Sequence, residues 1–112
     1  MIGLTVRWSL TDAPDGVVDR LKAYVRDESF ARFERQAGLR FKTWRLVEAE
    51  WFEGCYVFVD DAARARFQSS FEKVAAESAG SKIIGSAPTR IEPCDIAAVV
   101  EGPEGFVASG SL

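Results

Sequence analysis

The chain has 112 residues, of which 47% are hydrophobic and 28% charged, and its formal net charge is −3. This length predicts one compact domain, and the acidic balance disfavours a nucleic-acid partner, which requires a basic surface. The absence of histidine excludes Ser-His-Asp and Cys-His catalysis and removes the commonest metal and haem ligand. No apolar run reaches the roughly 20 residues that cross a bilayer, and the first residues lack a signal-peptide pattern. We therefore expect a cytoplasmic protein with no membrane partner and no histidine-ligated metal site.

The first third of the chain predicts a strand followed by a helical region. Residues 2–9 alternate apolar and polar side chains, as in a strand with one buried face. Residues 11–14 place oxygen-bearing caps and a proline before an apolar stripe at helical spacing, which predicts that a helix begins there. Short oxygen side chains in residues 27–29 predict a kink in this helix. Gly38 is typical of a left-handed helix stop.

The middle of the chain predicts two more strands. Residues 39–47 and 55–59 are rich in β-branched and aromatic side chains, and the short connection over residues 50–54 predicts an antiparallel hairpin. Large apolar side chains occur at both the odd-numbered and the even-numbered positions of these strands, which face opposite sides of a sheet. We therefore expect both faces of the sheet to be covered.

The last part predicts a helix and an edge strand. Asp60 or Asp61 is expected to cap a helix that ends at Gly80. Residues 82–100 have β-rich composition but contain two prolines, which favour an edge strand. We assign residues 1–101 to a single domain and residues 102–112, rich in Gly and Ser, to a flexible tail.

The resulting order β-α-β-β-α-β predicts an α+β, ferredoxin-like fold with a four-stranded antiparallel sheet and both helices on one face. The strand order fourth, first, third, second separates Cys55 from Cys94 by two strand spacings, roughly 9–10 Å, which predicts two reduced thiols. The second face of the sheet would be an exposed apolar surface. A homodimer with the two sheets face to face would cover it and enclose a chamber.

A motif pattern in residues 37–67 resembles a known family. The pattern comprises a Gly at the helix end, Lys-x-Trp in the second strand, Tyr-x-Phe in the third, and an Asp before an Ala-rich helix: Gly38, Lys42, Trp44, Tyr56, Phe58 and Asp60. It resembles the YdhR-like monooxygenases of the dimeric α/β-barrel, antibiotic-biosynthesis-monooxygenase-like superfamily. The resemblance implies a homodimeric dimeric α/β barrel that oxygenates a small aromatic or apolar substrate without metal or bound cofactor. Because the scaffold hosts many activities, a non-catalytic ligand-binding or scaffold domain stays open as the alternative.

The candidate site follows from placing side chains on the open face of the sheet. The residues expected to line the chamber are Thr5, Arg7, Lys42, Trp44, Tyr56 and Phe58, with Trp51 near its mouth. Lys42 is placed there because a lysine beneath the helices would be buried without a partner.

The expected catalytic roles are those of Arg7 and Lys42 as holders of a substrate anion and Tyr56 as a proton acceptor. Thr5, Trp44, Phe58 and Trp51 are expected to contact the substrate. Two alternatives stay open: the aromatic residues fill a dimer core, and the two basic residues form salt bridges or extend over the sheet. The carboxylates near the hairpin are expected to be solvated.

Overall fold

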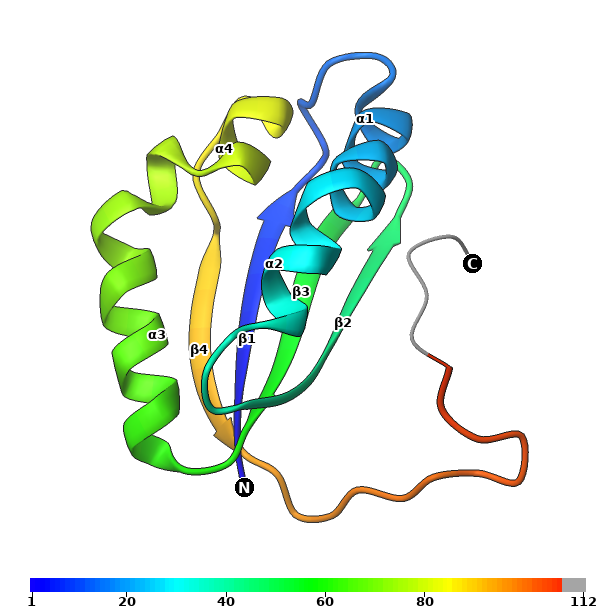
Figure 1. The fold of residues 1–112 in the computed structure, drawn as a ribbon. Helices are drawn as coiled ribbons and strands as arrows, with labels where there is room; N and C mark the ends of the chain where they lie inside the picture. The colour runs from blue at the N-terminus through cyan, green and yellow to red at the C-terminus, as the bar shows by residue number, and fades with distance from the viewer. Residues whose placement is uncertain (108–112) are drawn as a thin grey trace.

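The computed structural model describes residues 1–107. The chain forms one sheet and four α-helices (Figure 1). Their bounds are β1 (Ile2–Ser9), α1 (Val17–Tyr24), α2 (Phe30–Glu34), β2 (Leu39–Val47), β3 (Trp51–Phe58), α3 (Asp61–Val74), α4 (Ala79–Ile84) and β4 (Arg90–Asp95). The tail predicted for residues 102–112 lies partly outside the described residues, which end at residue 107.

The four strands form an antiparallel sheet in the order β2-β3-β1-β4, which confirms the predicted order. The helices cover one face of this sheet (Figure 1). The fold is therefore α+β and compatible with a ferredoxin-like arrangement. Both Cys55 and Cys94 are free thiols, as the strand order predicts.

The core lies between the sheet and the helices. In β1 the predicted alternation is confirmed, because Leu4, Val6 and Trp8 are buried beneath the helices. Residues directly opposite one another on paired strands share a face. Since Tyr56 of β3 lies opposite Leu4, and Phe52 lies opposite Trp8, the even-numbered side chains of β3 join the same core.

The helical region begins later than predicted and contains an irregular turn. Helix α1 follows Gly16, which has a left-handed φ of 80° and no side-chain cap, so the predicted start in residues 11–14 is wrong. The predicted interruption is confirmed. A π-helical turn spans Val25–Ser29, and this wider turn places both of its ends in the protein interior. Phe33 of α2, which follows this turn, is buried in the core.

The hairpin turn occupies residues 48–50, with Ala49 at a φ of 65°. The predicted connection over residues 50–54 is therefore wrong by a few residues. Glu53 and Gly54 belong to β3, and both are buried within the sheet. This difference determines where the side chains of the hairpin point.

Helix α3 begins as predicted, because the Asp60 carboxylate accepts a hydrogen bond from the Ala63 N–H at 2.8 Å. Gly80 does not end it. Instead Gly80 lies inside α4, where a Cβ atom would come within 3.2 Å of the Trp8 ring. Trp8 Nε1 donates to Ser81 Oγ at 3.0 Å, which fixes α4 against the sheet. The edge position of β4 is confirmed.

Candidate functional site: a groove beside the edge strand

The residues predicted to line one chamber lie on two opposite faces of the sheet. Tyr56 pairs with Leu4 on one side and with Lys42 on the other, so all three point toward the helices. Trp44 and Phe58 share this parity, whereas Thr5, Arg7 and Trp51 belong to the opposite parity. The placement of Lys42, Trp44, Tyr56 and Phe58 on the open face is therefore wrong. These four residues do lie on one face together, as predicted, but it is the helix face.

The unfavourable burial that motivated the predicted position of Lys42 is compensated in part, because aromatic rings and a hydroxyl surround its ammonium group. Its Nζ lies 3.5 Å from the ring centroid of Phe33, 4.3 Å from that of Tyr56 and 4.5 Å from that of Trp44. A cation over an aromatic face is stabilised by the ring's quadrupole. Nζ also donates a hydrogen bond to Tyr56 Oη at 3.0 Å.

Burial shifts the protonation equilibria of this pair. Loss of water around the amine, and then the positive charge of Arg32, lower the pKa of Lys42 well below its ordinary value. Burial likewise raises the pKa of Tyr56, so this side chain remains a neutral phenol. The pair therefore combines an amine that loses its proton readily with a phenol that retains its own.

The aromatic surroundings continue from the pair into the core and toward the surface. Phe33 packs edge-on against Tyr56 and Trp44, with centroid distances of 5.6 and 6.0 Å. Phe30 stacks on Trp44 at 6.4 Å, and Phe58 stacks on Tyr56 at 6.0 Å. Aromatic side chains of α2, β2 and β3 thus form a continuous wall beside the amine.

This wall borders a groove of about 670 Å³ between the helices and the edge strand β2. Its apolar lining comes from the helical region, from β2 and from the C-terminal segment: Val25, Phe30, Phe33, Leu39, Phe41, Trp44, Leu46, Phe106 and Val107. Lys42 supplies an amine to this lining. A mainly apolar groove with a few polar groups is the usual form of a small-molecule site.

The rim of the groove is basic. Its exposed charged residues are Lys22, Arg26, Glu34, Arg40 and Arg45. Residues 17–46 together carry eight basic and four acidic side chains, although the whole chain is acidic. This excess of positive charge around an apolar groove favours an anionic ligand.

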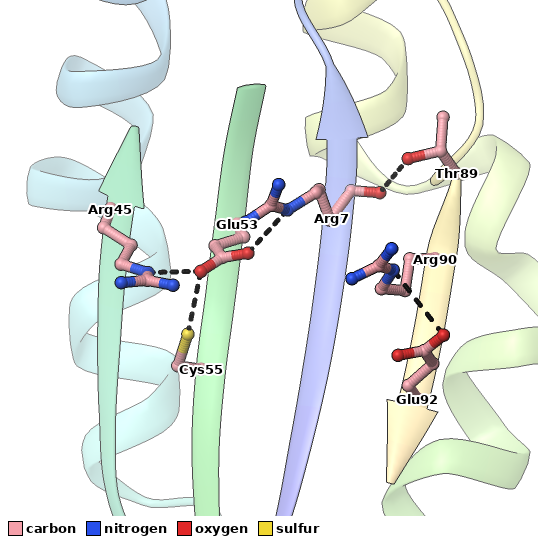
Figure 2. A network of polar contacts seen from close by, with 7 residues as sticks. All are labelled: Arg7, Arg45, Glu53, Cys55, Thr89, Arg90 and Glu92. Carbon is pink, nitrogen blue, oxygen red and sulfur yellow. Dashed lines mark hydrogen bonds and ion pairs between the residues drawn. The ribbon is translucent and has the colours of Figure 1, made fainter. Parts of the chain in front are cut away.

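The open face of the sheet carries a separate polar network (Figure 2). Glu53 is only 1% exposed, although it lies on the face that the helices leave bare. Arg7 Nε donates to one of its carboxylate oxygens at 2.8 Å, and Arg45 Nε donates to the other. Cys55 Sγ donates to that second oxygen at 3.3 Å. The expectation that the carboxylates near the hairpin are solvated is therefore wrong for Glu53.

The electrostatics of this network are those of a closed structural cluster. Burial favours the neutral acid, but the hydrogen bonds from Arg7 and Arg45 outweigh it and hold the pKa of Glu53 below its usual value. Burial and the adjacent carboxylate raise the pKa of the Cys55 thiol. A thiol that resists ionisation is a poor nucleophile.

Arg7 and Trp51 belong to this network. The Arg7 guanidinium lies 4.3 Å from the Trp51 ring centroid, and that of Arg45 lies 5.3 Å from it. Register places Arg7 opposite Glu53 on one side and Arg90 on the other. The predicted catalytic residues are thus divided: Lys42 lines the groove and donates a hydrogen bond to the buried Tyr56, whereas Arg7 lies across the sheet with Thr5 and Trp51.

Phe30 and Phe33 were missed as site residues. Their helical spacing was visible in the sequence, but the π turn that directs them toward β2 has no comparable signal. Glu53 was missed because the turn was placed too late. Among residues 1–107, no cluster of three or more His, Cys, Asp or Glu side chains could hold a metal ion. Within the same range, no helix has the length and apolarity that spanning a membrane requires.

Comparisons with known proteins support the fold alone. No family model matches the sequence, and no curated protein matches it. Among solved structures, the chain is similar to the NE2512 protein of unknown function from Nitrosomonas europaea, with a TM-score of 0.64. The two share 18% sequence identity over 90% of this chain and 93% of that one.

Proposed function

We propose that this protein is a cofactor-independent monooxygenase that binds a small aromatic anion in the groove between the α1–α2 region and β2. The observation that carries the proposal is that Lys42 and Trp44 line this groove, while the buried Tyr56 accepts a hydrogen bond from Lys42 Nζ. These residues belong to the motifs by which the sequence resembles the YdhR-like monooxygenases. The basic rim supports an anionic ligand, and the aromatic wall supports an aromatic one.

The residues present suit the reaction. In its neutral form the Lys42 amine takes a proton from an activated C–H or O–H group of the substrate. The resulting ammonium then lies beside the substrate anion and stabilises it in a site with little water. The electron-rich anion reduces O2 and combines with it to form a peroxide. Loss of water leaves a new carbonyl group, so that a CH2 group and O2 give C=O and H2O.

Oxygen consumption with a panel of anthrone-like and quinol-like substrates tests the proposal. The wild-type protein is expected to consume one O2 per substrate. Lys42→Met is expected to lower the rate by a factor of about 10² to 10⁴, the usual contribution of a positioned acid or base. Lys73→Met is the matched control, because Lys73 lies exposed on α3 and does not line the groove, and it should retain most of the rate. Equal rates for wild type and Lys42→Met would overturn the assignment.

A non-catalytic ligand-binding domain is the second candidate. It is favoured by the near-complete burial of Phe58 and Tyr56, which gives both residues a packing role whether or not the groove is catalytic. Thermal stabilisation by aromatic carboxylates without any oxygen consumption would select this candidate.

We also propose a homodimer that buries the open face of the sheet. This face presents Trp51 and the arginines around Glu53. A chamber between two such faces would be lined by Thr5 and Arg7 instead of Lys42 and Tyr56. Light scattering on the wild-type protein and on Thr5→Arg tests the assembly: a dimer that dissociates in the variant is expected, and a wild-type monomer would rule it out.

A further inference from the structure

We propose that Lys42 is a carbonyl-reactive amine, whose Nζ condenses with the aldehyde or ketone group of a small aromatic acid in the groove to form an imine. This inference rests on the proposed function, because it uses the same groove and the same anionic aromatic ligand. It adds the class of functional group that the site recognises and a covalent step that monooxygenation does not require.

The first support is the position of Nζ. Lys42 lines the groove, and its amine lies against the faces of Phe33, Trp44 and Tyr56. Within residues 1–107, no carboxylate oxygen lies within salt-bridge distance of this amine. The amine is therefore held by aromatic rings and the Tyr56 hydroxyl, and no acid in the described part of the chain competes with a carbonyl compound for it.

The second support is the charge that faces the amine from the surrounding elements. The positive charge of Arg32 disfavours the ammonium form of Lys42. The charged residues of the rim are Lys22, Arg26, Glu34, Arg40 and Arg45, of which Arg26 pairs with Asp27 and Arg45 with Glu53.

The neighbouring aromatic rings favour the ammonium form in part, but burial still lowers the pKa of Lys42 well below that of a solvated lysine. A desolvated lysine next to other cations is the usual environment of an imine-forming amine.

The third support is Tyr56, whose Oη lies 3.0 Å from Nζ. In the reaction, the nitrogen lone pair forms a bond to the carbonyl carbon, and a proton moves from nitrogen to the carbonyl oxygen to give a carbinolamine. Tyr56 Oη then donates a proton to the departing hydroxyl group, which leaves as water as the C=N bond forms. Tyr56 recovers its proton from the nitrogen. The products are one imine and one water.

The rim explains why the ligand should also carry a carboxylate. Lys22 and Arg40 are exposed on the rim of the groove. A ring that bears an aldehyde at one end and a carboxylate at the other would place the aldehyde toward Lys42 and the anion toward these cations. We therefore choose para-carboxybenzaldehyde as the probe.

The test is reductive trapping of the intact protein at neutral pH. Para-carboxybenzaldehyde and sodium cyanoborohydride are added, and the modified residue is located by peptide mass mapping. A single carboxybenzyl group on Lys42 is expected. Lys22, Lys73 and Lys82 are internal controls because all three are exposed. Labelling spread over these exposed lysines, with none on Lys42, would overturn the inference.

Two variants separate chemistry from folding. Lys42→Arg keeps a cation but cannot form an imine, so trapping at this position should be lost while the melting temperature shows that the fold remains. Tyr56→Phe should slow trapping by about tenfold, because it removes the proton donor. Unchanged trapping kinetics in Tyr56→Phe would contradict the role given to this hydroxyl.

Terephthalate, which resembles the probe but carries a second carboxylate in place of the aldehyde, distinguishes this inference from the proposed function. Terephthalate binding together with trapping at Lys42 supports both. Binding without trapping at Lys42 overturns the imine and leaves the anion site. Trapping at Lys42 without terephthalate binding supports the amine chemistry and overturns the anionic groove. Neither binding nor trapping overturns both.

Discussion

Among residues 1–107, Glu53 is the most buried charged side chain. Its negative charge is compensated by arginines on the two neighbouring strands. Arg7 is 29% and Arg45 60% exposed, so the carboxylate is buried while its partners reach solvent. Glu53→Gln would leave the two guanidinium groups without their shared anion. We expect a loss of about 2 kcal/mol in unfolding free energy, below the range for fully buried pairs because both arginines keep contact with water.

Urea denaturation measures this loss, and Asp27→Asn is the control. Asp27 pairs with Arg26 in a contact where both side chains are more than half exposed, so its loss should cost at most about 0.5 kcal/mol. The pKa of Glu53 is lowered in the folded state, so its contribution is present above the unfolded value of about 4.3 and is lost as pH falls below it. The difference between wild type and Glu53→Gln should therefore shrink in acid. A pH-independent difference would contradict this account.

Lys42 should make the free energy of unfolding depend on pH in the neutral-to-alkaline range, whereas Glu53 does so in acid. Its pKa is lowered in the folded state, so between that lowered value and the unfolded value of about 10.4 the unfolded chain binds more protons. Stability should therefore rise with pH across this window. Melting curves from about pH 7 to pH 10 should show wild type gaining stability relative to Lys42→Met. A constant difference between the two proteins would show that the amine is solvated.

At the scale of elements, Gly38 determines how α2 is joined to β2. It has a φ of 78°, and a Cβ atom there would lie 2.5 Å from the Cβ atom of Ala63 at the start of α3. Gly16 provides a matched control, because its φ is 80° but the space around it is open. Gly16→Ala should cost about 1 kcal/mol from backbone strain. Gly38→Ala should cost a further 1–3 kcal/mol, roughly, from the steric conflict. Equal losses in chemical denaturation would contradict the close approach of α3.

The elements and their order were predictable from the sequence, but the faces of the hairpin were not. The alternation in β1 and the cap at Asp60 are local signals, and both are confirmed. The turn of the hairpin depends on Ala49, an alanine with positive φ that no local preference indicates. Because the predicted turn lay too late in the sequence, Glu53 was assigned to the turn and expected to be solvated instead of belonging to β3.

The error at Lys42 has a different cause. A lysine beneath a helix layer was expected to be costly because no acid was available to pair with it. The structure resolves this conflict with aromatic rings from α2 and the Tyr56 hydroxyl. Phe33 lies in α2, directly after the π-helical turn over Val25–Ser29. A π-helical turn changes the helical spacing of the residues that follow it, so the groove could not be derived from regular helical spacing along the chain.

At the scale of the whole molecule, charge is distributed unevenly. Residues 17–46 have an excess of four positive charges, whereas the complete chain has a net charge of −3. The basic part includes the α1–α2 region and β2, which together border the groove (Figure 1). A concave site bordered by one sign of charge concentrates ligands of the opposite sign. Aromatic anions should therefore be attracted to this side of a protein that is acidic overall.

The charge asymmetry predicts the effect of reversing the rim. In the double variant Lys22→Glu/Arg40→Glu, the affinity for an aromatic carboxylate such as terephthalate should fall by about tenfold or more, equivalent to about 1.4 kcal/mol. Lys73→Glu is the control, because Lys73 is exposed on α3, away from the groove, and its affinity should stay near that of wild type. Calorimetric titration at low salt and at about 1 M salt, where screening shortens the range of charges to about 3 Å, completes the test. At high salt, the difference in affinity between the wild type and the double variant should shrink. An equal loss of affinity in the double variant and in Lys73→Glu would mean that the net charge of the protein, not the groove rim, governs binding.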